Sequence, residues 1–248
     1  MSYSQFAYLY DDLMKDVPYH LWVKVVNEAI QKYGIKGKQL LDLACGTGEL
    51  TLRLSENGFD VTGVDLSEDM LAVAQAKLEE KGHNPKFFQQ NMAELELMTE
   101  FDVVGIFCDS INYLETEEDV ISTFQHVHSH VKEKGLFIFD VHSVHKMVHI
   151  FKDQTFAYNG EDISYIWQCF EGENPFSIEH ELTFFACDPS TSQYDRYDEL
   201  HFQRTYPVPQ YIEWLKQSGF QVLDVLVDFE HKTLEDECER IIFVTAKQ

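Results

Sequence analysis

The chain has 248 residues, 44% of them hydrophobic, which is enough to bury one sizeable core as a single globular unit. Its 43 Asp and Glu residues against 19 Lys and Arg give a formal net charge of -24. Such a surface repels a phosphate backbone and argues against nucleic acid as a partner, so an RNA substrate would need a local basic patch.

The N-terminal segment, "MSYSQFAYLYDDLMKDVP", has scattered charges and no apolar block, so it does not resemble a signal peptide. No apolar run of the sequence approaches the roughly 20 residues of a membrane span. We therefore expect a cytoplasmic protein without a membrane partner. Disulfides and metal sites are also not expected, because the cysteines lie far apart and form no CxxC pair: Cys45, Cys108, Cys169, Cys187 and Cys238.

The first half of the chain alternates between strand and helix patterns. A helix over about 19–33, bounded by Pro18 and Gly34, precedes a strand at "QLLDLAC" and a helix at "ELTLRLSEN". "DVTGVDL" predicts a second strand, after which Ser67 begins a helix that extends to about Lys81. "KFFQQN" and "FDVVGIFCD" predict a third and a fourth strand, the fourth apolar enough to be covered on both faces.

A helix that begins at Thr116 and ends at Gly135, followed by the strand "LFIFDV", completes this alternation and predicts a parallel sheet with helices on both faces. From about 155 to 206 the period changes to two, as in "ISYIWQCF", "IEHELTFFAC" and "YDELHFQRTY", which predicts three or more antiparallel strands. A helix near "PQYIEWLKQS" follows. The last two strands, "FQVLDVLVDF" and "RIIFVTAK", have no helix between them, so we expect an antiparallel hairpin at the sheet edge.

The stretch "LLDLACGTGEL" places a glycine turn directly after the first strand. In an open parallel sheet, ligands bind at the carboxyl ends of the strands where the strand order reverses, and Gly46 and Gly48 let the backbone approach a ligand closely. A dinucleotide fingerprint, GxGxxG, has its third glycine where this chain has Thr51. Asp65, at the end of the second strand, suits the ribose of a dinucleotide or of another nucleoside, so both remain open here.

With "VTGVDLSEDML" and "FFQQNMAEL" in the same order and spacing, the stretch resembles the class I S-adenosylmethionine-dependent methyltransferase family, over about 36–143 and 207–248. The resemblance implies a Rossmann-like α/β fold with a seven-stranded, mostly parallel sheet. Its core would comprise residues 1–154 and 207–248, and the antiparallel β insert at 155–206 would be a substrate lid.

The same resemblance implies S-adenosylmethionine as the cofactor. Asp42 and the turn at Gly46 and Gly48 would face its methionine end, and Asp65 its ribose hydroxyls. Asn91 stands where the family often has an aspartate that accepts from the adenine amino group. The other cofactor residues that the resemblance implies are Ala44, Leu66, Met70, Met92, Cys108 and Asp109.

The activated methyl group of a sulfonium needs mainly a well-positioned nucleophile, so a base is optional. If the acceptor loses a proton, Asp109, Asp140 and His142, at the mouths of the fourth and fifth strands, are candidate bases. Tyr113 and Asn112 are candidates to orient a substrate. No DPPY or NPPY tetrapeptide is present, which disfavours methylation of an amino group on a nucleobase.

Several other features have two interpretations each. The leader residues Tyr3, Tyr8 and Tyr10 either close over the cofactor or substrate or pack on the sheet. His201 and Arg204 either meet an anionic substrate group or lie in a surface salt bridge. The aromatic residues of the insert either roof a substrate pocket or pack on another subunit: Tyr158, Tyr165, Trp167, Phe170, Phe184, Phe185 and Phe202.

The histidines of "HVHSH" invite a metal interpretation, but only His126 and His130 share a helix face, so a solvated helix surface is predicted instead. We predict a methyltransferase that acts on a small-molecule acceptor by in-line displacement. The alternatives are a catalytically silent, nucleoside-binding regulator and an NAD-dependent oxidoreductase.

Overall fold

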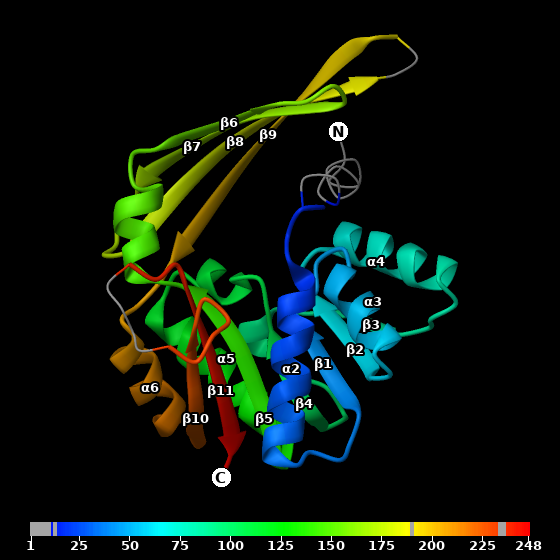
Figure 1. Cartoon of the computed structure of the whole chain (residues 1–248), viewed down its shortest axis with the longest axis vertical. Helices are drawn as coiled ribbons and strands as arrows, with labels where there is room; N and C mark the ends of the chain where they lie inside the picture. Colours follow the sequence, from blue (N-terminus) through cyan, green and yellow to red (C-terminus); the bar gives the residue numbers. More distant parts are fainter. Residues whose placement is uncertain (1–10, 12–13, 189–190, 233–236) are drawn as a thin grey trace.

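The computed structural model describes residues 11, 14–188, 191–232 and 237–248, so Tyr3, Tyr8 and Tyr10 lie outside the described residues. A seven-stranded sheet with the order β10-β11-β5-β4-β1-β2-β3 forms the core (Figure 1). The strands β1 to β5 are parallel, whereas β11 is antiparallel to both β5 and β10. The predicted sheet and its hairpin edge are confirmed. The strands are β1 (Gln39–Leu43), β2 (Asp60–Asp65), β3 (Lys86–Gln89), β4 (Phe101–Ile106), β5 (Val131–His142), β10 (Phe220–Val227) and β11 (Arg240–Lys247).

Helices cover both faces of this sheet. On one face α2 and α3 pack against core residues such as Leu40 and Ile138, and on the other face α5 and α6 pack against Phe137 and Phe139. The helices are α2 (Tyr19–Tyr33), α3 (Glu49–Glu56), α4 (Glu68–Glu80), α5 (Glu117–His130) and α6 (Val208–Gln217), with short helical turns at Met92–Glu94, Ser110–Tyr113 and Lys146–Phe151.

The helix boundaries follow the predicted capping residues with one exception. Gly34 ends α2 in a left-handed conformation, and the hydroxyls of Ser67 and Thr116 accept backbone N–H groups at the starts of α4 and α5. The prediction that Gly135 ends α5 was wrong, because the helix ends at His130 and β5 begins at Val131.

The reason lies in long-range pairing. Val131 pairs with Phe101 of β4, and the ladder then shifts register before Leu136 pairs with Val103. Lys134 takes a left-handed φ of 64° at this irregularity, so the turn that Gly135 signals lies inside a strand.

A second, four-stranded sheet has the order β6-β7-β8-β9, and all its pairs are antiparallel. Its strands are β6 (Thr155–Asn159), β7 (Ile163–Glu171), β8 (Ser177–Asp188) and β9 (Gln193–Arg204). It projects from the core and slants above the carboxyl ends of the parallel strands (Figure 1). Near the core, Met147, Phe151, Cys169 and Ile178 form a small hydrophobic cluster of their own. The second sheet therefore has a packed base close to the core.

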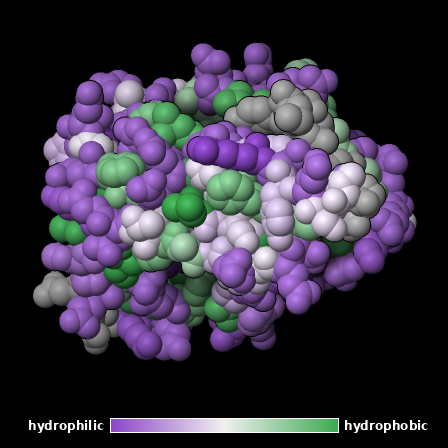
Figure 2. Space-filling model, turned by 90° about the horizontal axis from the view of Figure 1, so that it is seen from above, coloured by the Kyte–Doolittle hydropathy of each residue, from purple (hydrophilic) through white to green (hydrophobic). Residues whose placement is uncertain are grey.

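The face of the molecule seen from above in Figure 2 is predominantly hydrophilic, in keeping with the excess of acidic residues. Among the described residues, no helix has the length and apolar character needed to cross a membrane. The five cysteines are free thiols.

Candidate active site

The turn between β1 and α3 is built from residues with left-handed backbones. Ala44, Gly46 and Gly48 have φ values of 63°, 54° and 75°. At Gly48 a Cβ would lie 2.8 Å from the Cβ of Ala74, so a side chain there would collide with α4. At Gly46 a Cβ would meet no atom within 4 Å. Gly48 thus permits close helix packing, whereas Gly46 borders open space.

Asp65, at the end of β2, holds this turn in place. Its Oδ2 accepts the backbone N–H of Gly46 at 2.7 Å, and its Oδ1 accepts that of Ser67 at 2.9 Å. The carboxylate therefore joins the glycine turn to the start of α4. Burial raises the pKa of Asp65, while the N–H groups of Ser67 and Gly46 oppose this.

Asp42, near the end of β1, is almost fully buried, with 1% of its surface exposed. Thr51 donates its hydroxyl to Asp42 Oδ2 at 2.5 Å. Burial raises the pKa of Asp42 to about 7, although the Thr51 hydrogen bond lowers it. Thr51, which stands where the GxGxxG fingerprint has its third glycine, thus donates a hydrogen bond to the strand that leads into the turn.

A cavity of about 690 Å³ opens above the ends of β1, β2 and β4, where the strand order reverses. This volume is typical of a ligand pocket. Of the predicted cofactor residues, Asp109 and Gly48 do not line it. Those that do are Asp42, Ala44, Gly46, Asp65, Leu66, Met70, Asn91, Met92 and Cys108.

The acceptor side of the cavity is lined by residues that follow β4 and by one residue of the second sheet. Ser110, Tyr113 and Thr116 come from the core, and His201 comes from β9. The rings of Tyr113 and His201 meet edge to face, with 5.8 Å between their centroids. The cavity therefore continues from the glycine turn to the second sheet.

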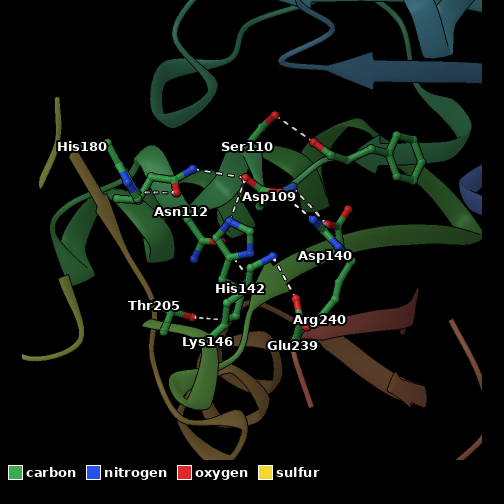
Figure 3. A network of polar contacts seen from close by, with 12 residues as sticks. Asp109, Ser110, Asn112, Asp140, His142, Lys146, His180, Thr205, Glu239 and Arg240 are labelled. Atoms are coloured by element: carbon green, nitrogen blue, oxygen red, sulfur yellow. Dashed lines mark hydrogen bonds and ion pairs between the residues drawn. The ribbon is translucent and has the colours of Figure 1, made fainter. Parts of the chain in front are cut away.

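Asp109 is turned away from the cavity. Cys108 and Asp109 both have left-handed backbones, with φ values of 55° and 53°, so β4 ends at Ile106 and not at Asp109 as predicted. Asp109 Oδ1 accepts from Arg240 Nη2 at 2.8 Å, and Oδ2 lies 3.1 Å from His142 Nε2 (Figure 3). Burial alone would raise the pKa of Asp109, but His142 and Arg240 hold it well below its usual range.

His142 does not line the cavity either. Burial lowers the pKa of His142, and the carboxylate of Asp109, which accepts from Nε2, only partly opposes this. Its Nδ1 is buried without a hydrogen-bond partner among the described residues. Asp109 and His142 therefore form a closed pair below the cavity.

The same pair belongs to a buried network that reaches helix α2. Arg240, at the start of β11, also donates to Asp140 through Nη1, and Trp22 of α2 donates to Asp140 Oδ1 at 2.7 Å. The Arg240 guanidinium lies 5.0 Å from the Trp22 ring centroid. The guanidinium of Arg240 thus serves two carboxylates, the partly buried Asp109 and the fully buried Asp140.

Polar contacts also join the core to the base of β9 (Figure 3). Gln203 Nε2 donates to Asp109 Oδ2 at 3.1 Å, and Gln203 Oε1 lies 3.2 Å from His180 Nε2. Asn112 is fully buried and donates to the carbonyl of Arg204 at 2.8 Å. Asn112, a candidate to orient a substrate, does not line the cavity.

Sequence reasoning missed Arg240, Trp22 and Gln203. Gln203 lies two residues after His201 on a predicted strand, so the period of two would have placed both on one face. No local pattern indicated the other two, which pair with residues more than 100 positions away.

Arg204 forms no ion pair with a described residue. It donates to the carbonyls of Glu115 at 2.9 Å and Pro175 at 3.3 Å, and its guanidinium lies over the Tyr206 ring. Of the insert aromatics, Tyr158, Phe170 and Phe202 are exposed, whereas Phe184 is buried.

The predicted solvated surface at "HVHSH" was wrong. His130 is buried, and its Nε2 accepts the N–H of Leu97 at 2.9 Å. His126 Nδ1 lies 2.8 Å from the carbonyl of Leu95, and His128 packs against Phe220. These side chains fix the segment after β3 to α5. No group of three potential metal ligands occurs among the described residues.

A methyltransferase domain family matches residues 40–135, which span the glycine turn and the ends of β2 and β4. A protein of Geobacillus sp. (strain WCH70) with a provisional methyltransferase name is 51% identical over 248 residues, covering 100% of both chains. The chain belongs to the class I S-adenosylmethionine-dependent methyltransferase family.

Solved structures agree with this assignment. An S-adenosylmethionine-dependent methyltransferase from Clostridium acetobutylicum ATCC 824 superposes with a TM-score of 0.90 and 31% identity, over 99% of this methyltransferase and 98% of that chain. The sugar N-methyltransferase KedS8 from Streptoalloteichus sp ATCC 53650 superposes with a TM-score of 0.78 and 22% identity, over 97% and 92%. KedS8 shares the fold.

Proposed function

We propose that this methyltransferase uses S-adenosylmethionine to methylate a small molecule by in-line displacement. The observation that carries the proposal is the cavity at the switch point of the sheet, which runs from the glycine turn to His201. The family assignment favours methyl transfer over the hydride chemistry of an oxidoreductase.

The residues present fit this cofactor. The open space beside Gly46 leaves room for a ligand against the backbone, and the buried carboxylate of Asp42 suits an ammonium group. The cofactor supplies a methyl group already activated on a sulfonium. In this proposal Asp42, Ala44 and Gly46 hold its methionine end, Asp65 and Leu66 its ribose, Met70, Asn91 and Met92 its adenine, and Cys108 lies beside the reacting end.

The charge of the cavity favours a neutral or cationic acceptor. The described lining residues include no Lys or Arg, and their acidic members are Asp42, Glu49, Asp65, Glu115 and Asp119. On the acceptor side, Glu115 and Asp119 disfavour an acceptor that carries phosphate or carboxylate groups. KedS8 is named a sugar N-methyltransferase, so an amino sugar is a suitable first acceptor to test.

The chain's own part is to orient the acceptor and exclude water. Tyr113 orients the acceptor in this proposal, and the segment 155–206 acts as a lid over the core formed by 1–154 and 207–248. Asp109 and His142 are positioning residues here, because Arg240 keeps Asp109 ionised and neither side chain lines the cavity.

Calorimetry of the cofactor-free protein with S-adenosylmethionine, S-adenosylhomocysteine and NADH tests the cofactor. We expect both adenosyl ligands to bind and NADH to be silent. Asp65→Asn should weaken adenosyl binding about tenfold or more, because hydrogen bonds to a charged acceptor are worth about 1.5–3 kcal/mol. Asp60→Asn, at the exposed start of the same strand, is the matched control. Binding of NADH alone would refute the proposal.

A catalytically silent regulator would bind the adenosyl ligands equally well, so turnover must separate the two functions. Incubation with S-adenosylmethionine and glucosamine, followed by quantification of S-adenosylhomocysteine, is the first assay. Release that depends on the acceptor supports an enzyme.

A further inference from the structure

His201 belongs to the second sheet but reaches the cavity of the core. Residues two apart on a strand share a face, so His201 and Gln203 point to the same side of β9. Gln203 contacts Asp109 at 3.1 Å, which fixes this face of the strand against the core. His201 is thereby directed into the cavity, where its ring meets that of Tyr113.

Within the described part of the chain, no hydrogen bond or ion pair engages the ring nitrogens of His201. Its cross-strand neighbour His180 differs, because Trp167 donates to Nδ1 at 3.1 Å and Nε2 contacts Gln203. His142 directs Nε2 to Asp109 and does not line the cavity. Of these three histidines, His201 is the one whose nitrogens are available to a molecule in the cavity.

The protonation state suits a proton acceptor. Burial lowers the pKa of His201 below its ordinary value, so the imidazole is neutral at pH 7 and offers a lone pair. The groups around it are His180 and Glu199 on the sheet, and Tyr113 and Asp119 on the core side of the cavity.

We propose that His201 is the proton acceptor of the methyl transfer and is presented to the acceptor molecule from β9. This inference rests on the proposed function. In the step, the lone pair of an amine or hydroxyl of the acceptor forms the bond to the methyl carbon. The sulfonium sulfur keeps the electron pair of the bond that breaks, and the proton released by the acceptor passes to the imidazole.

A first test needs no acceptor. The whole protein with isotope-labelled histidines is titrated by NMR in complex with S-adenosylhomocysteine and with sinefungin, which carries an amino group near the position of the transferred methyl. The signal of His201 is assigned by its loss in His201→Gln. We expect a His201 pKa below 6.5, and a lower value with sinefungin than with S-adenosylhomocysteine, because a nearby cation disfavours the imidazolium. Equal values in the two complexes overturn the proposal.

The second test is kinetic, with glucosamine as the probe acceptor. His201→Ala should lower kcat about 100-fold or more while leaving the Kd of S-adenosylmethionine within about twofold. Added imidazole should restore part of the rate, which a purely structural role would not allow. His231→Gln, at an exposed position, is the control.

The two proposals fail in different ways. If the wild type turns over but His201→Ala shows neither a loss of kcat nor a rescue by imidazole, the role of His201 is overturned and methyl transfer is not. If the wild type binds the cofactor and methylates no amine or hydroxyl probe, the proposed function is contradicted, and the NMR comparison alone decides whether His201 faces the reacting position.

Discussion

The buried carboxylate of Asp42 should make the cofactor-free protein less stable than it would be with a neutral side chain. Its pKa is about 7 in the fold against 3.8 for an unperturbed Asp. The folded protein therefore binds an extra proton between these values, and the stability that this group contributes falls as the pH rises from about 4 to 7.

The magnitude follows from that difference. About 3 pKa units at 1.36 kcal/mol each correspond to about 4 kcal/mol of destabilisation above pH 7, and to about 1.5 kcal/mol at pH 5. Asp42→Asn removes the charge but keeps an oxygen that accepts from the Thr51 hydroxyl. We expect the gain in free energy of unfolding of the variant over the wild type to be about 2–3 kcal/mol larger at pH 8 than at pH 5.

Urea unfolding of both cofactor-free proteins at the two pH values measures this gain, with Asp60→Asn as the exposed control. The comparison between pH values cancels any change in packing that is the same at both. A difference between wild type and Asp42→Asn that does not vary with pH would refute the reasoning. In the same variant, adenosyl-ligand binding should weaken, since the proposed partner of the cofactor ammonium is lost.

Two further predictions concern the architecture of the site. Gly48→Ala should destabilise the protein by about 2–4 kcal/mol, because it strains a left-handed backbone and drives a Cβ to 2.8 Å from that of Ala74. Gly46→Ala faces open space and should cost about 1 kcal/mol, and similar losses for the two in thermal unfolding would contradict the role of packing. Arg240→Met should destabilise by about 3–5 kcal/mol, since it removes the cation from the fully buried Asp140 and the partly buried Asp109. Arg196→Met, in an exposed pair, should have little effect, and chemical denaturation of both variants tests the contrast.

Where local chemistry decides a structure, the sequence predicted it well. The period of the apolar residues and the caps Ser67, Thr116 and Gly34 placed the helices, because each cap acts within one turn. The prediction from Gly135 failed because a turn residue has the same local pattern at a helix end and at an irregularity inside a strand. The pairing of Val131 with Phe101, which separates the two cases, is a long-range contact.

The residues of the candidate site also divide into those that the local sequence predicts and those that depend on long-range contacts. The residues around the glycine turn are close in sequence, and their places on the cavity could be predicted. Asp109 could not be placed, because an aspartate after a strand has the same pattern whether it faces a ligand or an arginine 131 positions away. For His201 the strand could be predicted, but the contact between Gln203 and Asp109 that turns this face of the strand to the core could not.

The contacts at the base of β9 have a mechanical consequence. Gln203, Arg204 and Thr205 are each tied to the core, through Asp109, Asn112 and the carbonyl of His142. The strand is 12 residues long and extends about 40 Å from this attachment. The second sheet is therefore attached at one end only along β9. A tilt of about 5° at this attachment would displace the far end of the strand by about 3.5 Å, but it would move His201, which lies close to the attachment, by less than 1 Å. Bending of the distant part of the sheet would therefore leave the position of His201 at the cavity nearly unchanged.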